Sequence, residues 1–159
     1  MDLYNNVLPV LLLQPAALIN DTDTKSKLLD VRGFTKSEIV VALGDLTGVD
    51  ADSILSLTLQ ESDTTADADF TSVAVAQMNR DTTGLASTST AGLFATVNAT
   101  TEDIVCYRAE YLGTKRYIRA LCDFTPGTGG ITSAFITVVG LLAGARHAAA
   151  TAPAPVTAT

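Results

Sequence analysis

The feature that most constrains the fold of this chain is an alternation of apolar and polar residues with a period of two. It is clearest in residues 54–60, where Leu55, Leu57 and Leu59 alternate with serine, threonine and glutamine. Successive side chains of a strand point to opposite faces, so this pattern predicts a half-buried antiparallel strand. The sequence shows no convincing amphipathic helix, and it therefore favours an all-β fold.

Related β-patterns recur between turn-forming segments rich in Gly, Pro and Asp. We expect strands at residues 27–31, 37–43, 54–60, 70–75 and 90–97, and three more within residues 104–140. Residues 37–43 are apolar on both faces, which predicts a central strand buried on both sides. Residues 112–115 and 126–130 are predicted to be hairpin turns, and residues 77–89 a surface loop. About eight short strands predict an antiparallel β-sandwich of jelly-roll type.

The ends of the chain differ in composition from its middle. We expect an apolar N-terminal arm and loop at 1–26, the β-sandwich at 27–142, and an Ala/Pro/Thr-rich tail at 143–159. The arm contains Leu11, Leu12 and Leu13, and its two prolines exclude one regular helix. Two interpretations of its exposed apolar surface remain open. The segment either covers the domain's own core or docks on a neighbouring subunit.

The charge balance indicates a protein partner. Only 17% of the residues are charged, and the formal net charge is -7. Nucleic-acid binding needs a basic face, so direct contact with nucleic acid is not expected. The main basic cluster comprises Lys115, Arg116 and Arg119, with Arg108 nearby. It is either a solvated edge with local salt bridges or an interface patch.

We find no set of residues with the spacing of a catalytic or metal site, and we expect neither enzyme activity nor a cofactor. The single histidine, His147, lies in the tail, away from any candidate nucleophile or second ligand. The acidic segment 61–69 could supply oxygens to Ca²⁺, but its spacing does not match an EF-hand, and a solvated loop is the alternative. Cys106 and Cys122 are either buried thiols or a cross-strand disulfide.

The N-terminus gives no indication of secretion or membrane insertion. It lacks a basic region before the apolar run, and that run is too short and too interrupted to span a bilayer. We therefore expect the chain to be made and folded in a cytoplasm, with no membrane partner.

Two sequence blocks together resemble a known family. One is residues 57–63 followed by 70–73; the other is residues 107–119, which read YRAEYLGTKRYIR, followed by the Gly-rich loop, a β-run and Arg146-His147. The chain is thereby similar to small proteins of tailed bacteriophages encoded near the major capsid protein. Members of that family look like capsid cement, or decoration, proteins with a jelly-roll β-sandwich. The resemblance covers roughly residues 28–147.

The resemblance implies a function, a place and a partner. It implies a trimer, made in the host bacterial cytoplasm, that binds the major capsid protein on the outside of the phage head and stabilises the shell. Alternatives are another virion protein (a head-tail connector, a tail component or a fibre base) and a carbohydrate- or peptide-binding module. The residues expected at the interface are Leu11, Leu12, Leu13, Arg116, Arg119 and Arg146.

Overall fold

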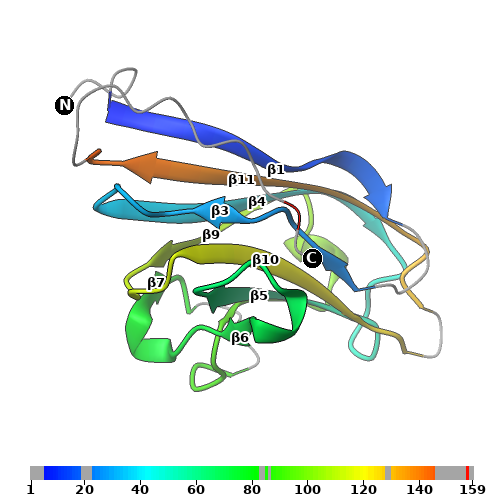
Figure 1. Ribbon diagram of the computed structural model, residues 1–159. Helices are drawn as coiled ribbons and strands as arrows, with labels where there is room; N and C mark the ends of the chain where they lie inside the picture. The colour runs from blue at the N-terminus through cyan, green and yellow to red at the C-terminus, as the bar shows by residue number, and fades with distance from the viewer. Residues whose placement is uncertain are drawn as a thin grey trace.

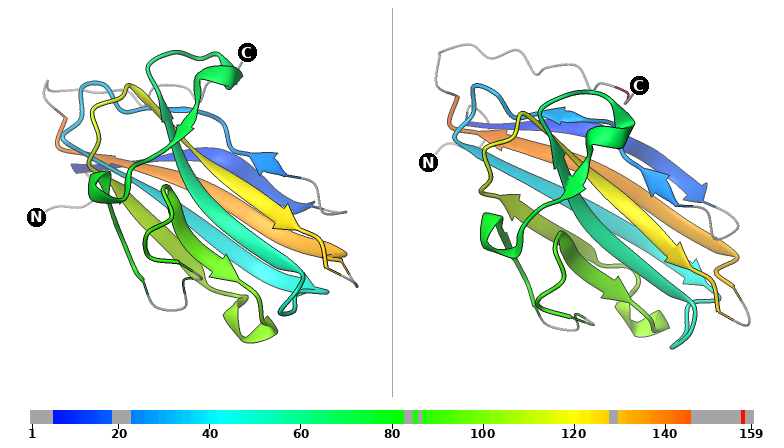
Figure 2. Two further views of the ribbon diagram at one scale, coloured as in Figure 1. Left: turned by 90° about the horizontal axis from the view of Figure 1, so that it is seen from below. Right: turned by 60° about the horizontal axis from the view of Figure 1, so that its bottom comes forward.

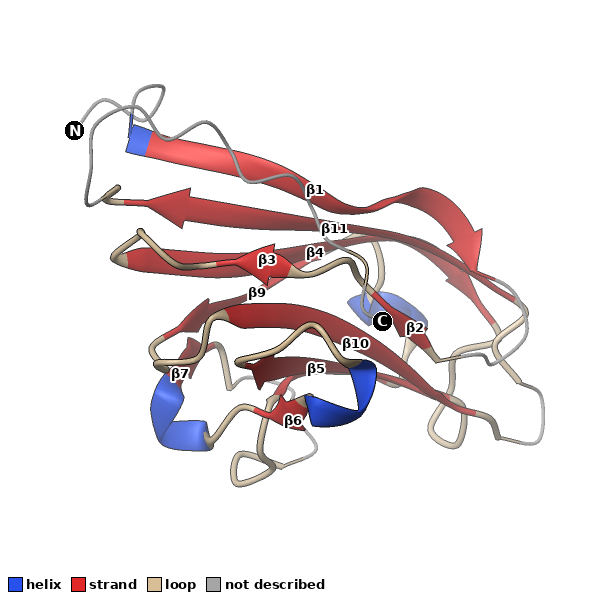
Figure 3. Cartoon of the chain, in the orientation of Figure 1, coloured by secondary structure: helices blue, strands red, loops and turns tan. Residues whose placement is uncertain are grey.

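A computed structural model describes residues 6–18, 23–82, 85, 87–127, 130–145 and 157. Strands dominate this part of the chain, and the helices η1 (Asp67–Asp69), η2 (Val75–Gln77) and η3 (Thr100–Glu102) are single 3-10 turns (Figure 3). Two antiparallel sheets pack against each other, so the all-β sandwich expected from the sequence is confirmed (Figure 1). The described residues form eleven strands rather than about eight, because several edge strands are only two or three residues long.

The first sheet, sheet A, has five strands in the order β1-β11-β4-β9-β7. Their bounds are β1 Val7–Leu18, β11 Ser133–Ala143, β4 Lys36–Thr47, β9 Cys106–Tyr111 and β7 Met78–Arg80. In β4 and β11 every second residue is buried along most of the strand. One face of sheet A therefore lines the core, and the other faces outward.

The second sheet, sheet B, is built on the long pair β10 and β5. The bounds of its strands are β10 Tyr117–Thr125, β5 Ile54–Ser62, β2 Thr24–Lys25, β3 Leu29–Asp30, β6 Thr71–Ser72 and β8 Leu93–Val97. β2 and β3 both pair with β10, while β6 and β8 both pair with β5. Each outer position of sheet B is thus shared by two short strands.

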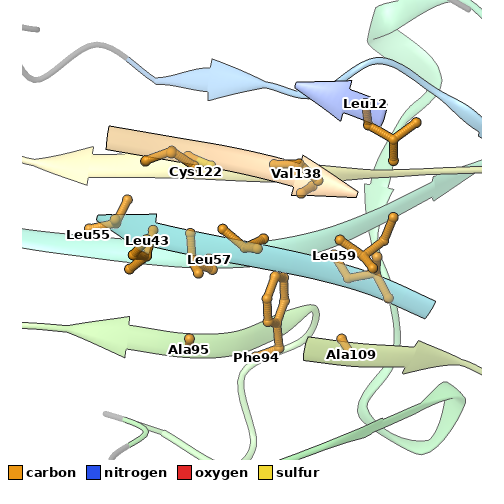
Figure 4. Close-up of a cluster of buried hydrophobic side chains, with 14 of the residues drawn as sticks. Leu12, Leu43, Leu55, Leu57, Leu59, Phe94, Ala95, Ala109, Cys122 and Val138 are labelled. Carbon is orange, nitrogen blue, oxygen red and sulfur yellow. The ribbon is translucent and has the colours of Figure 1, made fainter. Parts of the chain in front are cut away.

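The core lies between the two sheets and forms one large cluster of buried side chains (Figure 4). Leu57 of β5 and Val138 of β11 are fully buried in it, and Phe94 of β8 is 2% exposed. A smaller cluster of Leu28, Phe70 and Tyr117 is separate from this core. Ile118, Ala120, Cys122 and Phe124 share the inner face of β10, as the alternation predicts.

Neither predicted hairpin exists. β9 belongs to sheet A and β10 to sheet B, so residues 112–116 cross between the layers (Figure 2). The same holds for the connection from β10 to β11, of which residues 128 and 129 lie outside the described part. Each of these strands finds its pairing partner far along the chain: β9 pairs with β4, β10 with β5, and β11 with β1 and β4. Alternation identifies the strands, but it carries no information about which strands pair.

Residues 7–18 of the expected N-terminal arm form strand β1 of sheet A, so the sandwich begins before residue 27. β1 pairs antiparallel with β11, with register irregularities after Leu11 and Leu13. Leu12 is buried in the core, which agrees with the interpretation that the segment covers the domain's own core. Gly140 of β11 makes room for it, since a Cβ there would come within 2.7 Å of Leu29 and 3.2 Å of Leu12. Pro9 and Pro15 are tolerated because β1 is an edge strand.

Two smaller expectations also change. β4 continues to Thr47, beyond the expected end at residue 43, and β7 lies within the segment expected to be a loop. Of the expected C-terminal tail, residues 143–145 and Thr157 are described, and Arg146 lies outside the described residues. The interface role expected for Arg146 stays a prediction.

Candidate functional site: an apolar sheet face

The outer face of sheet A, called here the A face, is unusually apolar for an exposed sheet. Its apolar side chains come from β1, β4 and β11, and they are Leu11, Val40, Ala42, Phe135, Val139 and Leu141. Leu11 is 48% exposed and Phe135 is 53% exposed, while the others are half-buried by their neighbours on the sheet. The strand at 37–43 is therefore not buried on both sides as expected. Its second apolar row belongs to the A face.

Cross-strand pairing arranges the A face in rows. Leu11 lies opposite Val139, Val139 opposite Val40, and Val40 opposite Arg108. The adjacent row joins Thr137, Ala42 and Cys106. Rows of this kind bring side chains of neighbouring strands into contact and give the face a continuous apolar centre.

Phe135 lies at one end of this apolar centre. A Cβ at Gly44 would lie 2.9 Å from the Cβ of Phe135, so only glycine allows the phenyl group to approach β4 so closely. The backbone N–H of Ile104 bonds the carbonyl oxygen of Gly44 at 3.4 Å. Ile104 is 74% exposed and has a positive φ of 54°, which is uncommon for a β-branched residue. Apolar surface thus continues from the sheet onto the segment before β9.

The opposite end of the A face carries balanced charges. Lys36 Nζ lies 2.6 Å from Glu110 Oε1, and Arg108 Nε lies 3.6 Å from Glu38 Oε1. Hydrogen bonds from Lys36 and Asn79 lower the pKa of Glu110 below its ordinary value and keep its carboxylate charged. These side chains line a shallow hollow of about 650 Å³ at this end of the face. Arg80 and Asp81 also line the hollow, so three cations and three anions leave it with little net charge.

The outer face of sheet B is different, because the chain covers part of it. The Arg119 side chain is only 2% exposed; its guanidinium lies 4.0 Å above the Phe70 ring, bonds Gln60 Oε1 at 2.8 Å, and pairs with Asp67. Lys25 also pairs with Asp67, at 2.7 Å. These contacts hold η1 and Phe70 against the sheet. The two faces of the sandwich therefore differ in cover and in polarity.

The residues expected at the interface differ in how far they are exposed in the structure. Leu12 and Arg119 are buried within the chain, so their expected availability to a partner is wrong. Leu11 is exposed on the A face, and Leu13 packs partly against the core. Arg116 donates to Asp30 Oδ2 from Nε at 3.1 Å and from Nη2 at 2.9 Å, and it lies over the Tyr117 ring. Its contacts fit the interpretation of a solvated edge with local salt bridges.

Sequence reasoning missed Phe135, Val40 and Ile104 as surface residues. The available signal was the apolar character of both faces at 37–43 and 134–139. Such strands are usually buried on both sides. Among the residues that the structure describes, a second layer covers only one side of sheet A, and several apolar side chains of the other side are exposed.

The acidic segment 61–69 is paired rather than open to a metal. Asp63 pairs with Lys115 at 2.6 Å, Asp67 pairs with Lys25 and Arg119, and Asp69 accepts from Thr64 at 2.5 Å. The lysine partners are the main cause of the lowered pKa values of Asp63 and Asp67. Across the described ranges, no three His, Cys, Asp or Glu side chains gather as a metal site would require.

The two cysteines are free thiols in different surroundings. Cys106 is exposed on the A face and Cys122 is buried in the core, so neither the disulfide nor two buried thiols is correct. β9 and β10 belong to different sheets, and the cysteines therefore do not face each other across a hairpin. Burial raises the pKa of the Cys122 thiol to about 12.

We expect the Cys122 thiol to be unreactive in the folded chain. In a Cys106→Ser variant, a thiol reagent at pH 8 should label Cys122 at least about 100-fold more slowly in buffer than in denaturant, because the reactive thiolate is rare and enclosed. Absorbance of the released chromophore measures the rate. Equal rates in buffer and denaturant would place Cys122 outside the core.

Asp123 is a carboxyl group that the fold disfavours in its charged form. Burial raises its pKa, and the charge of Asp23 and a hydrogen bond with it raise the pKa further. A carboxyl whose pKa is higher in the folded state destabilises the fold once the pH exceeds the unfolded value of 3.8. We expect Asp123→Asn to raise the free energy of unfolding at pH 7 by up to about 1 kcal/mol.

The gain from Asp123→Asn should disappear below pH 3.8, where both folded and unfolded carboxyls are protonated. Urea unfolding of both proteins at pH 7 and pH 3 measures this difference. Asp45→Asn, a change elsewhere on the chain, serves as the control for a lost negative charge. A stability gain of equal size at both pH values would contradict the role assigned to Asp123.

Comparisons with protein-family models, with curated proteins and with solved structures find no match to this chain. Within the part that the structure describes, no helix has the length and apolar character needed to cross a membrane.

Proposed function

We propose that the chain is a capsid cement protein, which binds the major capsid protein on the outer surface of a tailed-phage head. The observation that carries the proposal is the apolar A face, because it marks the chain as one that works by packing against protein. A single chain that leaves Leu11 and Phe135 about half exposed on one face of a sheet has a surface suited to protein association. The function proposed is therefore structural and works through assembly, without a catalytic step.

The order of the strands supports the jelly-roll type of sandwich. Sheet A contains β1-β11-β4-β9, and sheet B contains β2 and β3, then β10, then β5, then β6 and β8. From β8 to β11 the chain alternates between the two sheets, and the last two strands, β10 and β11, lie beside the first strands of the fold. A jelly roll has this arrangement, and it is common among viral capsid domains. The resemblance of residues 57–73 and 107–119 to phage cement proteins points to the same class.

The physical demands of a cement role fit the chain. Shell stabilisation comes from many modest contacts repeated over a symmetric surface. Once one contact has formed, the effective local concentration for the next is high, so the combined binding is stronger than any single contact. The low charge content and Thr-rich surface reduce the desolvation cost of such contacts. The proposed place is the virion surface after synthesis in the bacterial cytoplasm, and the proposed assembly is a homo-oligomer. Three copies are what the resemblance to cement proteins implies.

The proposal is tested on phage particles that lack the protein. They should lose packaged DNA at a lower temperature than complete particles, and adding the purified full chain to expanded capsids should restore heat resistance. Copy number provides a second measurement, since cement protein covers the whole shell in many copies. A few copies at one vertex would instead indicate a connector or tail component. Equal heat stability with and without the protein would refute the cement role.

A further inference from the structure

We propose that the A face packs against the A face of a second copy of this chain, which gives a two-fold dimer with four stacked sheets. This proposal adds an assembly state to the function proposed above. It rests on that function only in that the chain works by associating with protein. The partner that packs on the A face is a second copy of the chain. The capsid would then meet the remaining surfaces of the dimer.

The size of the A face matches that of a stable interface. β1 and β4 have 12 residues each and β11 has 11, at a rise of about 3.3 Å per residue. Three strands about 4.8 Å apart give a footprint of about 14 Å by about 37 Å, or roughly 500 Å². A specific protein–protein interface buries at least about 1,000 Å² over the two partners together, and two copies of this footprint reach that value. One copy of the A face is therefore large enough to hold another.

Charge favours a copy of the same chain over a strongly charged partner. With a net charge of -7, two copies repel each other over most of their surface. The charged end of the A face is an exception, because Lys36 and Arg108 balance Glu38 and Glu110 on the same surface. A neutral face neither repels its copy nor selects a partner of one charge.

Pairing through the β1 edge is a poorer alternative. The long edge of sheet A is that of β1, since the strand at the other edge, β7, has only three residues. Pro9 and Pro15 lack the N–H groups that such a ladder needs, and the register irregularities interrupt a regular edge. Face-to-face packing avoids this problem, since sheets stack about 10 Å apart through side chains alone.

The symmetry of this contact fixes the number of copies. A surface that packs on itself is isologous and closes at two copies. The inferred dimer therefore differs from the trimer that the family resemblance implies. Measured mass separates the two: two chains of 16.5 kDa against three.

The experiment measures the mass of the purified full chain by sedimentation equilibrium at micromolar concentrations. Wild type should have the mass of two chains. Leu11→Asp and Phe135→Glu should each weaken the association more than tenfold, because each buries a charge in an apolar interface. Leu112→Asp is the matched control: Leu112 is 45% exposed, close to the 48% of Leu11, but lies in the crossover outside the A face. Circular dichroism should show that all three variants remain folded.

Cys106 supplies a readout that needs no change on the A face. Its thiol is exposed in the single chain and sits in the row of Thr137 and Ala42, so the second copy should cover it. In wild-type protein, labelling of Cys106 should slow at least tenfold as the concentration rises through the dissociation range. Phe135→Glu protein should be labelled fast at all concentrations.

Four results would overturn the inference: a monomer at high micromolar concentration, a trimer, dissociation by Leu112→Asp equal to that by Leu11→Asp, or rapid labelling of Cys106 in associated protein. The cement role fails separately. A protein that dimerises through the A face but gives no heat resistance to capsids would refute only the proposed function. A monomer that protects capsids would refute only the dimer.

Discussion

Leu12→Ala is expected to lower the free energy of unfolding by about 2–5 kcal/mol. Leu12 is 1% exposed and lies in the core beside Leu29. Removing its side chain loses the transfer free energy of the buried methyl groups and leaves a cavity between β1 and β3. Denaturant unfolding, with the midpoint and slope fitted together, measures the change.

The neighbouring Leu11→Ala is the control, since the two changes remove the same atoms one residue apart. Leu11 points outward and is about half exposed, so its loss should change the stability of the single chain by no more than about 0.5 kcal/mol. This comparison is made at concentrations where the chain is monomeric. Equal and small effects at both positions would mean that residues 7–18 are an undocked arm.

Arg119→Ala is expected to destabilise the fold by about 2–3 kcal/mol, although the change removes a charged residue. The Arg119 stem and guanidinium cover the Phe70 ring, and Arg119 bonds Gln60. Truncation uncovers that ring and leaves the amide oxygen of Gln60 without this donor. The ion pair with Asp67 contributes little, because Asp67 is 44% exposed and its charge is screened by water.

A thermal melt of Arg119→Ala should therefore shift to lower temperature by about 5–10 °C for a domain of this size. Arg32→Ala is the matched control, since the Arg32 side chain is 69% exposed and lies 4.0 Å from Asp30. It should leave the melt almost unchanged. If salt at 1 M abolished the difference between the two variants, the effect would be one of charge and not of packing on Phe70.

Local pattern was sufficient to predict which residues of several strands face the core. Leu55, Leu57 and Leu59 are buried on one face of β5, and Ile118, Ala120 and Cys122 are buried on one face of β10. These predictions are correct because a period of two follows from backbone geometry, whichever strands pair. The class of fold follows from the same argument.

The pairing of strands could not be predicted in the same way. The turn at 112–115 resembles a hairpin connection, but Tyr111 shapes it differently: its hydroxyl accepts the N–H of Lys115 at 2.8 Å and donates to the buried Glu61 at 2.5 Å. That second bond ties the end of β9 to β5 of the opposite sheet. Because Tyr111 and Glu61 lie 50 residues apart in sequence, no local pattern reveals this bond.

Local sequence pattern was also insufficient to identify the exposed residues of the candidate site. Exposed apolar side chains such as Phe135 have the same sequence pattern as a strand covered on both sides. Whether a second layer covers them depends on how many layers the whole chain builds. The residues of the A face were visible in the sequence, but their exposure was not.

The position of β11 between β1 and β4 has a consequence for how the chain folds. β11 is the last strand along the described chain, and it is the only strand in that part with which β1 pairs. During synthesis, β1 remains unpaired until residues 133–143 have left the ribosome, and its apolar side chains Leu11, Leu12 and Leu13 are not yet covered. Closing so long a loop makes folding slow, and an apolar strand that waits is prone to aggregate. Yield from rapid expression should therefore depend on chaperones more than the stability of the finished sandwich would indicate.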